Sequence, residues 1–148
     1  MSRFTYSIHV NAPPERVFDV LADPRRRPEW DPGVEIKDFT DPSAAAIGTD
    51  FTMVGSVFGR RTESRRTITQ FERPKIFGHE SPRAKMLVRL EPVAGGTDLA
   101  MEEEFVMPLG LVGEWAARHL FKRWVMSEID KTAKRLKALV EAEVPAHA

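Results

Sequence analysis

The hydrophobic period of this sequence changes once, near Pro108, and this change limits the folds that the chain can adopt. The next proline is Pro145, and between them apolar side chains recur every three or four positions at Phe121, Trp124, Val125, Ile129, Ala133, Leu136 and Val140. This spacing predicts one long amphipathic helix. Residues 34–107 instead alternate apolar and polar side chains between turn signals such as Ser81-Pro82 and Gly95-Gly96, a pattern that predicts six strands.

A first strand and two short helices are expected before that region. Phe4, Tyr6, Ile8 and Val10 alternate with polar residues, so the even positions of this strand are predicted to face inward. Pro13-Pro14 and Asp23-Pro24 are typical helix starts, because proline fits a first turn, where its missing N–H leaves no hydrogen bond unmade. The order of elements predicts an α+β fold in which the long helix covers the apolar face of an antiparallel sheet.

Composition and charge exclude several classes of function. The 148 residues suit one domain, and 22 basic side chains balance 22 acidic ones, so we expect no nucleic-acid partner. The absence of cysteine excludes disulfides, thiolate catalysis and cysteine-based zinc sites. The longest apolar run, residues 105–113, is about half a membrane span, and the N-terminus lacks the layout of a signal peptide. We therefore expect a cytoplasmic protein with no membrane span.

Metal and nucleotide chemistry also have little support in the sequence. The four histidines, His9, His79, His119 and His147, are too scattered to suggest a local pair of metal ligands. The chain contains no Gly-x-Ser-x-Gly elbow, phosphate-binding glycine loop or dinucleotide fingerprint. We expect no metal and no cofactor.

The segments Ala12-Pro13-Pro14-Glu15-Arg16-Val17-Phe18, Leu21-Ala22-Asp23-Pro24 and Pro28-Glu29-Trp30 resemble those of the START-like (SRPBCC) superfamily. This superfamily of helix-grip proteins includes bacterial polyketide cyclase/dehydrase-type proteins and plant proteins like the birch-pollen allergen. The resemblance implies a helix-grip fold, with a seven-stranded antiparallel sheet curled around the C-terminal helix and a cavity between them. It also implies a single ligand-binding domain over residues 1–144, followed by a short tail at 145–148. It does not imply one activity, because the superfamily contains carriers, cyclases, receptors and regulators.

Two charged residues are predicted to face the interior. The odd positions of the last strand read Leu99, Met101, Glu103, Phe105 and Met107, and the even positions of the fourth read Thr62, Ser64, Arg66, Ile68 and Gln70. A buried Glu103 could act as a general acid or base or anchor a ligand, and an inward Arg66 could bind a ligand carboxylate or phenolate. The alternatives are a structural pairing of these two residues, a β-bulge that turns Glu103 to solvent, and an Arg66 that reaches water at the cavity mouth.

Other side chains are expected to line the cavity. They are Phe51, Met53, Met86, Val88, Met101 and Phe105 from the strands, Phe121 and Trp124 from the long helix, and Trp30 and Trp115 at the two ends. Methionine-rich walls suit a ligand site because flexible thioethers adapt to irregular shapes. Aromatic residues at helical spacing are also typical of a simple core. His119 lies among basic residues and is expected to be solvated.

Three functions remain open from the sequence. The first is binding of a hydrophobic or aromatic small molecule, lipid-like or polyketide-like, in the internal cavity. The second is a polyketide cyclase or dehydratase-like enzyme in which Glu103 moves protons and Arg66 or Gln70 orients an oxygen. The third is a module that regulates a protein partner. The protein is expected to be a monomer or a homodimer.

Overall fold

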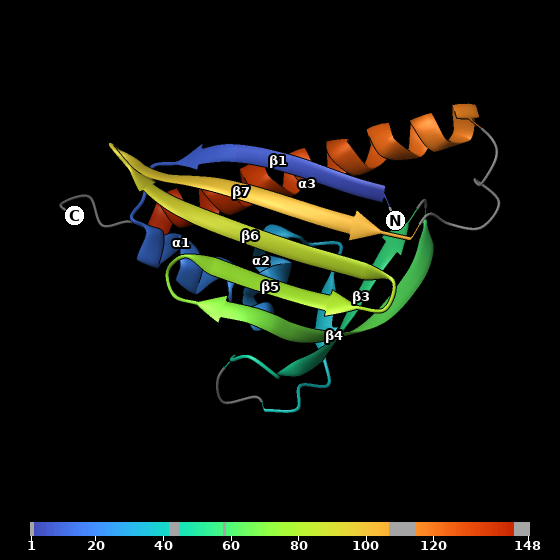
Figure 1. The fold of residues 1–148 in the computed structure, drawn as a ribbon, viewed down its shortest axis with the longest axis horizontal. Coiled ribbons are helices and arrows are strands. Elements are labelled where there is room, and N and C mark those ends of the chain that lie inside the picture. Colours follow the sequence, from blue (N-terminus) through green and yellow to red (C-terminus); the bar gives the residue numbers. More distant parts are fainter. Residues whose placement is uncertain (1, 42–44, 58, 107–114, 144–148) are drawn as a thin grey trace.

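A computed structural model describes residues 2–41, 45–57, 59–106 and 115–143. One antiparallel sheet of seven strands carries a long helix across one of its faces (Figure 1). The strands are β1 (Ser2–Val10), β2 (Glu35–Lys37), β3 (Asp50–Val57), β4 (Arg60–Glu72), β5 (Ile76–Ser81), β6 (Ala84–Val93) and β7 (Gly96–Phe105). Their order across the sheet is β1-β7-β6-β5-β4-β3-β2, so the first and last strands in the chain are paired. The predicted helix-grip architecture is confirmed.

The helical segments are α1 (Pro14–Leu21), the 3-10 turn η1 (Pro24–Arg26), α2 (Arg27–Trp30) and α3 (Trp115–Glu143). Two of the helical segments, α1 and η1, begin at the predicted proline signals. Asp23 caps η1, because its carboxylate accepts the backbone N–H of Arg25 at 3.1 Å. Along α3 the residues of the predicted apolar stripe, from Phe121 to Val140, face the sheet, and Trp124 among them stays partly exposed. Within the described residues, no helix is long and apolar enough to cross a membrane.

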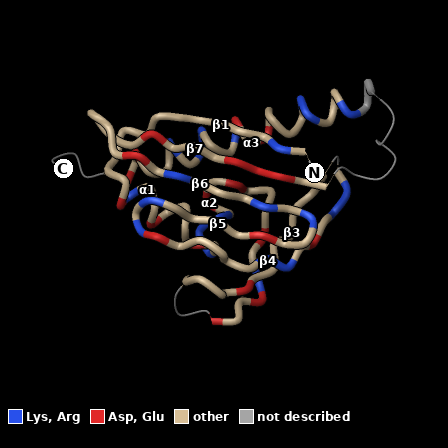
Figure 2. Tube along the Cα trace, in the orientation of Figure 1, with Lys and Arg blue, Asp and Glu red and all other residues tan. Residues whose placement is uncertain are grey.

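Strand β7 lies between β1 and β6 and shows the expected alternation. Leu99 and Met101 are buried and Ala100 is exposed. Near its end the strand carries the consecutive acids Glu102, Glu103 and Glu104, visible as a red run on β7 in Figure 2. Because neighbouring side chains of a strand point to opposite faces, Glu103 lies on the inner face and the other two on the outer face.

Strand β4 departs from the predicted alternation near its end. The register between β4 and β5 shifts between Ile68 and Gln70, so a β-bulge lies there. A bulge inserts one residue and exchanges the two faces of the strand beyond it. Gln70 is therefore exposed, and the prediction that it faces inward is wrong. Phe71 takes the inner face instead, with its ring centroid 5.2 Å from that of Phe18.

Gly96 begins β7 at the place where the chain passes close to the end of β1. Its φ is +151°, and a Cβ atom at this position would overlap the carbonyl oxygen of Val10. The neighbouring Gly95 has a φ of +83° but has no atom within 4 Å of the position of such a Cβ. Of these two glycines, only Gly96 therefore combines an unusual backbone conformation with a backbone contact that cannot relax.

We expect Gly96→Ala to lower the free energy of unfolding by roughly 3 kcal/mol, because the added methyl group pushes β1 and β7 apart. Gly95→Ala, which meets only the backbone strain, should cost about 1 kcal/mol. Urea denaturation of the two variants compares these costs. Equal costs would contradict the proposed clash.

A hydrogen bond joins the sheet edge to α3. The hydroxyl of Tyr6, on β1, donates to Asp130 Oδ1 at 2.6 Å, and Lys134 lies 3.0 Å from the other carboxylate oxygen. Burial, the hydrogen bond and repulsion from Asp130 raise the pKa of Tyr6 to about 12. The hydrogen bond to Tyr6, followed by that to Lys134, lowers the pKa of Asp130. The pair therefore holds its proton on the phenol.

Because Tyr6 is the single tyrosine of the sequence, its ionisation can be followed directly by the absorbance of tyrosinate. We expect a pKa of about 12, and a lower value in Asp130→Asn, which removes the repelling charge. The folded pKa lies above the unfolded one, so this contribution to stability is complete below about pH 10 and is lost as the pH rises toward the folded value. Asp98→Asn, on the same sheet but away from Tyr6, is the control. An unchanged titration in Asp130→Asn would contradict the pairing.

Candidate functional site

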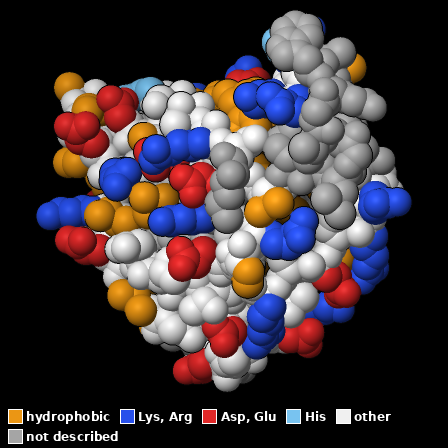
Figure 3. All heavy atoms as spheres, turned by 45° about the vertical axis from the view of Figure 1, so that its right-hand side comes forward, with side chains coloured by type: hydrophobic (Ala, Val, Ile, Leu, Met, Phe, Trp, Pro, Cys, Tyr) orange, Lys and Arg blue, Asp and Glu red, His pale blue; other side chains and the backbone are white. Residues whose placement is uncertain are grey.

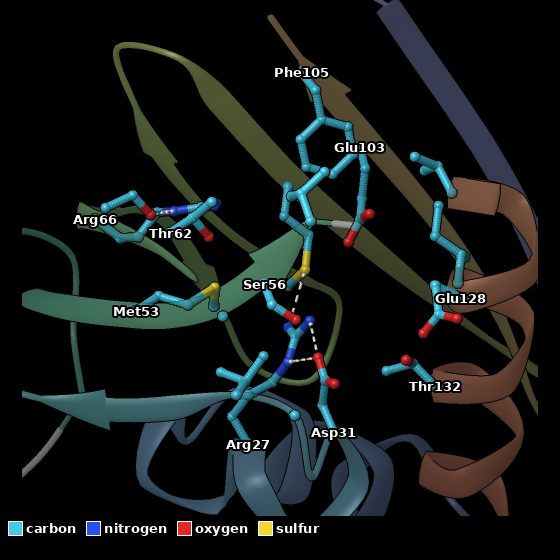
Figure 4. Close-up of a pocket in the computed structure, with 18 of the residues that line it drawn as sticks. Arg27, Asp31, Met53, Ser56, Thr62, Arg66, Glu103, Phe105, Glu128 and Thr132 are labelled. Atoms are coloured by element: carbon cyan, nitrogen blue, oxygen red, sulfur yellow. Dashed lines mark hydrogen bonds and ion pairs between the residues drawn. The ribbon is translucent and has the colours of Figure 1, made fainter. Parts of the chain in front are cut away.

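A cavity of about 450 Å³ lies between the inner face of the sheet and α3 (Figure 4). Strands β3 to β7 supply one wall, α3 supplies the opposite wall, and α2 with the residues after it closes the bottom. Its lining residues that are exposed to solvent are Gly33, Ser56, Thr62 and Lys85, and they mark where the cavity opens. Small-molecule sites in proteins typically measure roughly 300–1,000 Å³. The cavity is therefore large enough for a small organic molecule.

Much of the wall is apolar. Met53, Met86 and Met101 line the sheet side, Phe105 lies at the end of β7, and the helix contributes Phe121, Trp124, Val125 and Ile129. The rings of Phe121 and Trp124 lie 6.3 Å apart on adjacent turns of α3. Eight of the residues predicted from the sequence thus border the cavity: Met53, Arg66, Met86, Met101, Glu103, Phe105, Phe121 and Trp124.

The other predicted lining residues do not border it among the described side chains. Phe51 and Val88 are each 1% exposed, and Phe51 is covered by Phe39 and His79, with ring centroids 6.0 and 5.3 Å away. Trp30 is fully buried beneath Arg27, whose guanidinium carbon lies 4.3 Å from the ring centroid. These three are buried members of the hydrophobic core and do not line the cavity. The side chain of Trp115 lies outside the described residues.

Charged groups on one face of the molecule do not form a field of one sign. In the view of Figure 3, basic, acidic and apolar side chains are interspersed. His119 is exposed on α3, as expected, and does not line the cavity. Among the described residues, no group of three or more histidine or acidic side chains is arranged to hold a metal ion. The distinctive polar groups are those inside the cavity.

Arg66 enters the cavity from β4. Its alternation with Ser64 and Thr62 places all three on the inner face, and Phe51 is its partner across β3. Arg66 Nε donates to Ser64 Oγ at 2.8 Å, and Nη1 lies 3.4 Å from His79 Nδ1. Burial is the main cause that lowers the pKa of Arg66 to about 10, and repulsion from Arg27 adds to it. The guanidinium remains charged at neutral pH.

His79, on β5, is a polar neighbour that the sequence analysis did not single out. Burial, together with repulsion from Arg66 and Arg27, holds its pKa well below the usual value. The neutral ring accepts from Arg66 at Nδ1, which assigns the remaining proton to Nε2. His79 therefore supports Arg66 without neutralising it.

Arg27 and Asp31 form an ion pair that sequence reasoning also missed. Asp31 Oδ2 accepts from Arg27 Nη2 at 3.0 Å and from Nε at 3.1 Å, and Arg27 Nη1 lies 3.4 Å from the sulfur of Met86. The four-residue spacing of these opposite charges was a readable helical signal. What could not be read is that α2 points this pair into the cavity (Figure 4).

Glu103 points into the cavity from β7 (Figure 4). Its register partner on β6 is Met86, so an apolar side chain lies beside it. No hydrogen bond or ion pair holds its carboxylate among the described residues. Burial raises its pKa, although Arg27 and Arg66 oppose this effect. An unpartnered carboxyl group of this kind can exchange a proton with a bound molecule.

Comparison with known proteins identifies the family of the chain. Residues 1–141 match the family described as polyketide cyclase / dehydrase and lipid transport, and the chain belongs to that family. Comparison with curated proteins gives no match.

Several solved structures share the fold. A protein of Thermus thermophilus is 18% identical with a TM-score of 0.77, over 97% of this chain and 100% of that one. The polyketide-cyclase-like protein of Corynebacterium glutamicum is 26% identical with a TM-score of 0.64, over 98% and 94%. The di-domain ARO/CYC protein StfQ from the steffimycin biosynthetic pathway is 16% identical with a TM-score of 0.73, over 95% of this chain and 51% of that one.

Proposed function

We propose that this protein binds a hydrophobic or aromatic small molecule, lipid-like or polyketide-like, in the cavity between the sheet and α3. The observation that carries the proposal is the cavity of about 450 Å³ with three methionines and three aromatic rings on its wall. Each methylene group that a ligand buries there contributes about 0.8 kcal/mol. Family membership supports the same reading, because the family description includes lipid transport.

The direct test is native mass spectrometry of freshly purified protein, followed by denaturation and identification of any compound released. A stoichiometric apolar adduct is the expected result. Binding of Nile red, a neutral apolar dye whose fluorescence rises on burial, gives a second readout that does not require a co-purified ligand.

The mouth of the cavity offers a variant that leaves the core intact. Ser56 is exposed and lines the cavity from β3, whereas Ser127 is exposed on α3 and lies away from it. We expect Ser56→Trp to weaken Nile red binding by about tenfold, a loss of about 1.4 kcal/mol, because the indole occupies the entrance. Ser127→Trp should bind as the unmodified protein does. Equal binding by both variants would locate the dye elsewhere and count against the cavity.

An enzyme of the polyketide cyclase or dehydratase kind is the second candidate. The observation that favours it is Glu103, a carboxyl group inside the cavity with a raised pKa and no partner among the described residues. Such a group is suited to move a proton to or from a ligand oxygen or an acidic C–H bond. In this mechanism Arg66 would orient the oxygen, since Gln70 is exposed.

Replacing Glu103 by Gln tests the enzymatic function, because glutamine keeps the shape of the side chain but cannot transfer a proton. We expect a fall in kcat of about 10²- to 10⁴-fold on any poly-β-ketone that the protein converts. Glu104→Gln is the matched control, since Glu104 is adjacent in β7 but faces outward beside Arg3. An unchanged kcat in Glu103→Gln would exclude Glu103 as the catalytic acid or base.

A further inference from the structure

Arg66 is a buried cation that no acidic side chain among the described residues neutralises. The residue is 9% exposed, and its hydrogen-bond partners are the neutral groups of Ser64 and His79. Within the part of the chain that the structure describes, no acidic side chain forms an ion pair with Arg66. Burial of an unpaired charge is costly, and folded proteins normally compensate such a charge with a counter-ion. The cavity therefore contains a positive charge that lacks a counter-ion among the described residues.

The second arginine of the cavity does not share this property. Arg27 is neutralised by Asp31, which lies 3.0 Å away, and the two side chains are 12% and 19% exposed. His79 cannot act as an anion, and its neutral state leaves the charge of Arg66 uncompensated. The contrast between the two arginines places the free positive charge at the end of the cavity formed by β4 and β5.

We infer, resting on the ligand binding proposed above, that Arg66 and Glu103 form a subsite for the carboxylate of an apolar carboxylic acid. The planar guanidinium matches a carboxylate in geometry as well as in charge. Figure 4 shows Arg66 and Glu103 entering from different strands, with Met53 between β4 and the bottom of the cavity. The apolar body of the ligand then lies along the methionines, and the carboxylate points to the inner end.

Glu103 in its protonated form donates a hydrogen bond to the same carboxylate. The proton comes from solvent as the ligand anion enters, so one proton is taken up for each ligand bound while Glu103 is ionised in the empty protein. Burial already favours the protonated state of this side chain.

The remaining charges around Glu103 leave room for one anion. The ionisable groups that line the cavity with it are Arg27, Asp31, Arg66, His79, Lys85 and Glu128. Arg27 pairs with Asp31, and Glu128 lies 3.5 Å from Lys131 on α3. Lys85 is exposed, and its register partner is the outward-facing Glu104. Once these pairs, Lys85 and the neutral His79 are set aside, Arg66 is the cation that acts on Glu103, and its charge is available to a ligand anion when Glu103 is protonated.

The experiment compares carboxylic acids with the primary alcohols of the same skeleton, for example naphthoic acid with naphthalenemethanol and palmitic acid with hexadecanol. Isothermal titration calorimetry at neutral pH should show that the acid binds at least about tenfold more tightly than its alcohol. The affinity for the acid should fall as the pH rises above the raised pKa of Glu103, because ligand binding is then coupled to proton uptake. Affinity for the alcohol should not follow this dependence.

Variants assign the effect to the two residues. Arg66→Gln should remove the preference for the acid while alcohol binding persists, and Arg66→Lys should keep part of it. Arg65→Gln is the matched control, because Arg65 is exposed on the outer face of the sheet and donates to Thr52 of the neighbouring strand β3. Glu103→Gln should keep the preference and abolish its pH dependence.

The outcomes separate this inference from the proposed function. Tighter binding of the acid that depends on Arg66 supports the subsite. Equal affinity for acid and alcohol overturns the subsite but leaves the proposed apolar binding in place. Failure of every acid, every alcohol and Nile red to bind overturns both. The comparison in the unmodified protein needs no variant, so a misfolded Arg66→Gln does not prevent the test.

Discussion

The inner face of a seven-stranded sheet is wider than one helix can cover, and the structure follows from this mismatch. Helix α3 packs along the β1 edge, where Tyr6 reaches Asp130. Helix α1 lies against β6 and β7, and α2 lies against α3 and β2. Apolar side chains that face inward but meet no partner then border a cavity instead of a solid core. Burial of apolar area stabilises the covered part, and the uncovered part is available to a ligand.

Because the wall of that cavity is largely apolar, a charged group inside it loses much of its solvation and needs a partner. Arg27 and Asp31 neutralise each other as an ion pair, and Arg27 also covers the ring of Trp30. Arg66 and Glu103 are not neutralised in this way. Arg66 has only neutral hydrogen-bond partners, and Glu103 has no hydrogen-bond partner among the described residues. Desolvation lowers the pKa of Arg66 and raises the pKa of Glu103, and both shifts favour the neutral form of the side chain. Unpaired groups of this kind cost stability, and they are what a binding or catalytic site needs.

The family relationship explains the fold more fully than the chemistry. Proteins with 15–26% identity to this chain keep the same architecture over nearly its whole length, because strand alternation and one apolar helix face are enough to specify it. The chemistry depends on single side chains at a few inner positions, and these can change without affecting the fold. Positions such as Arg66 and Glu103 are therefore where proteins of the same shape can differ in function.

The sequence by itself determined the order of elements, the inward faces of most strands and the inward direction of Glu103 and Arg66, because alternation and helical spacing are local properties. It could not determine the bulge that turns Gln70 outward and Phe71 inward, since a bulge arises from pairing with β5. It could not show that Phe51, Val88 and Trp30 are covered, or that Arg27, Asp31 and His79 meet in the cavity. Those outcomes depend on how distant segments pack in three dimensions, and only the tertiary structure decided them.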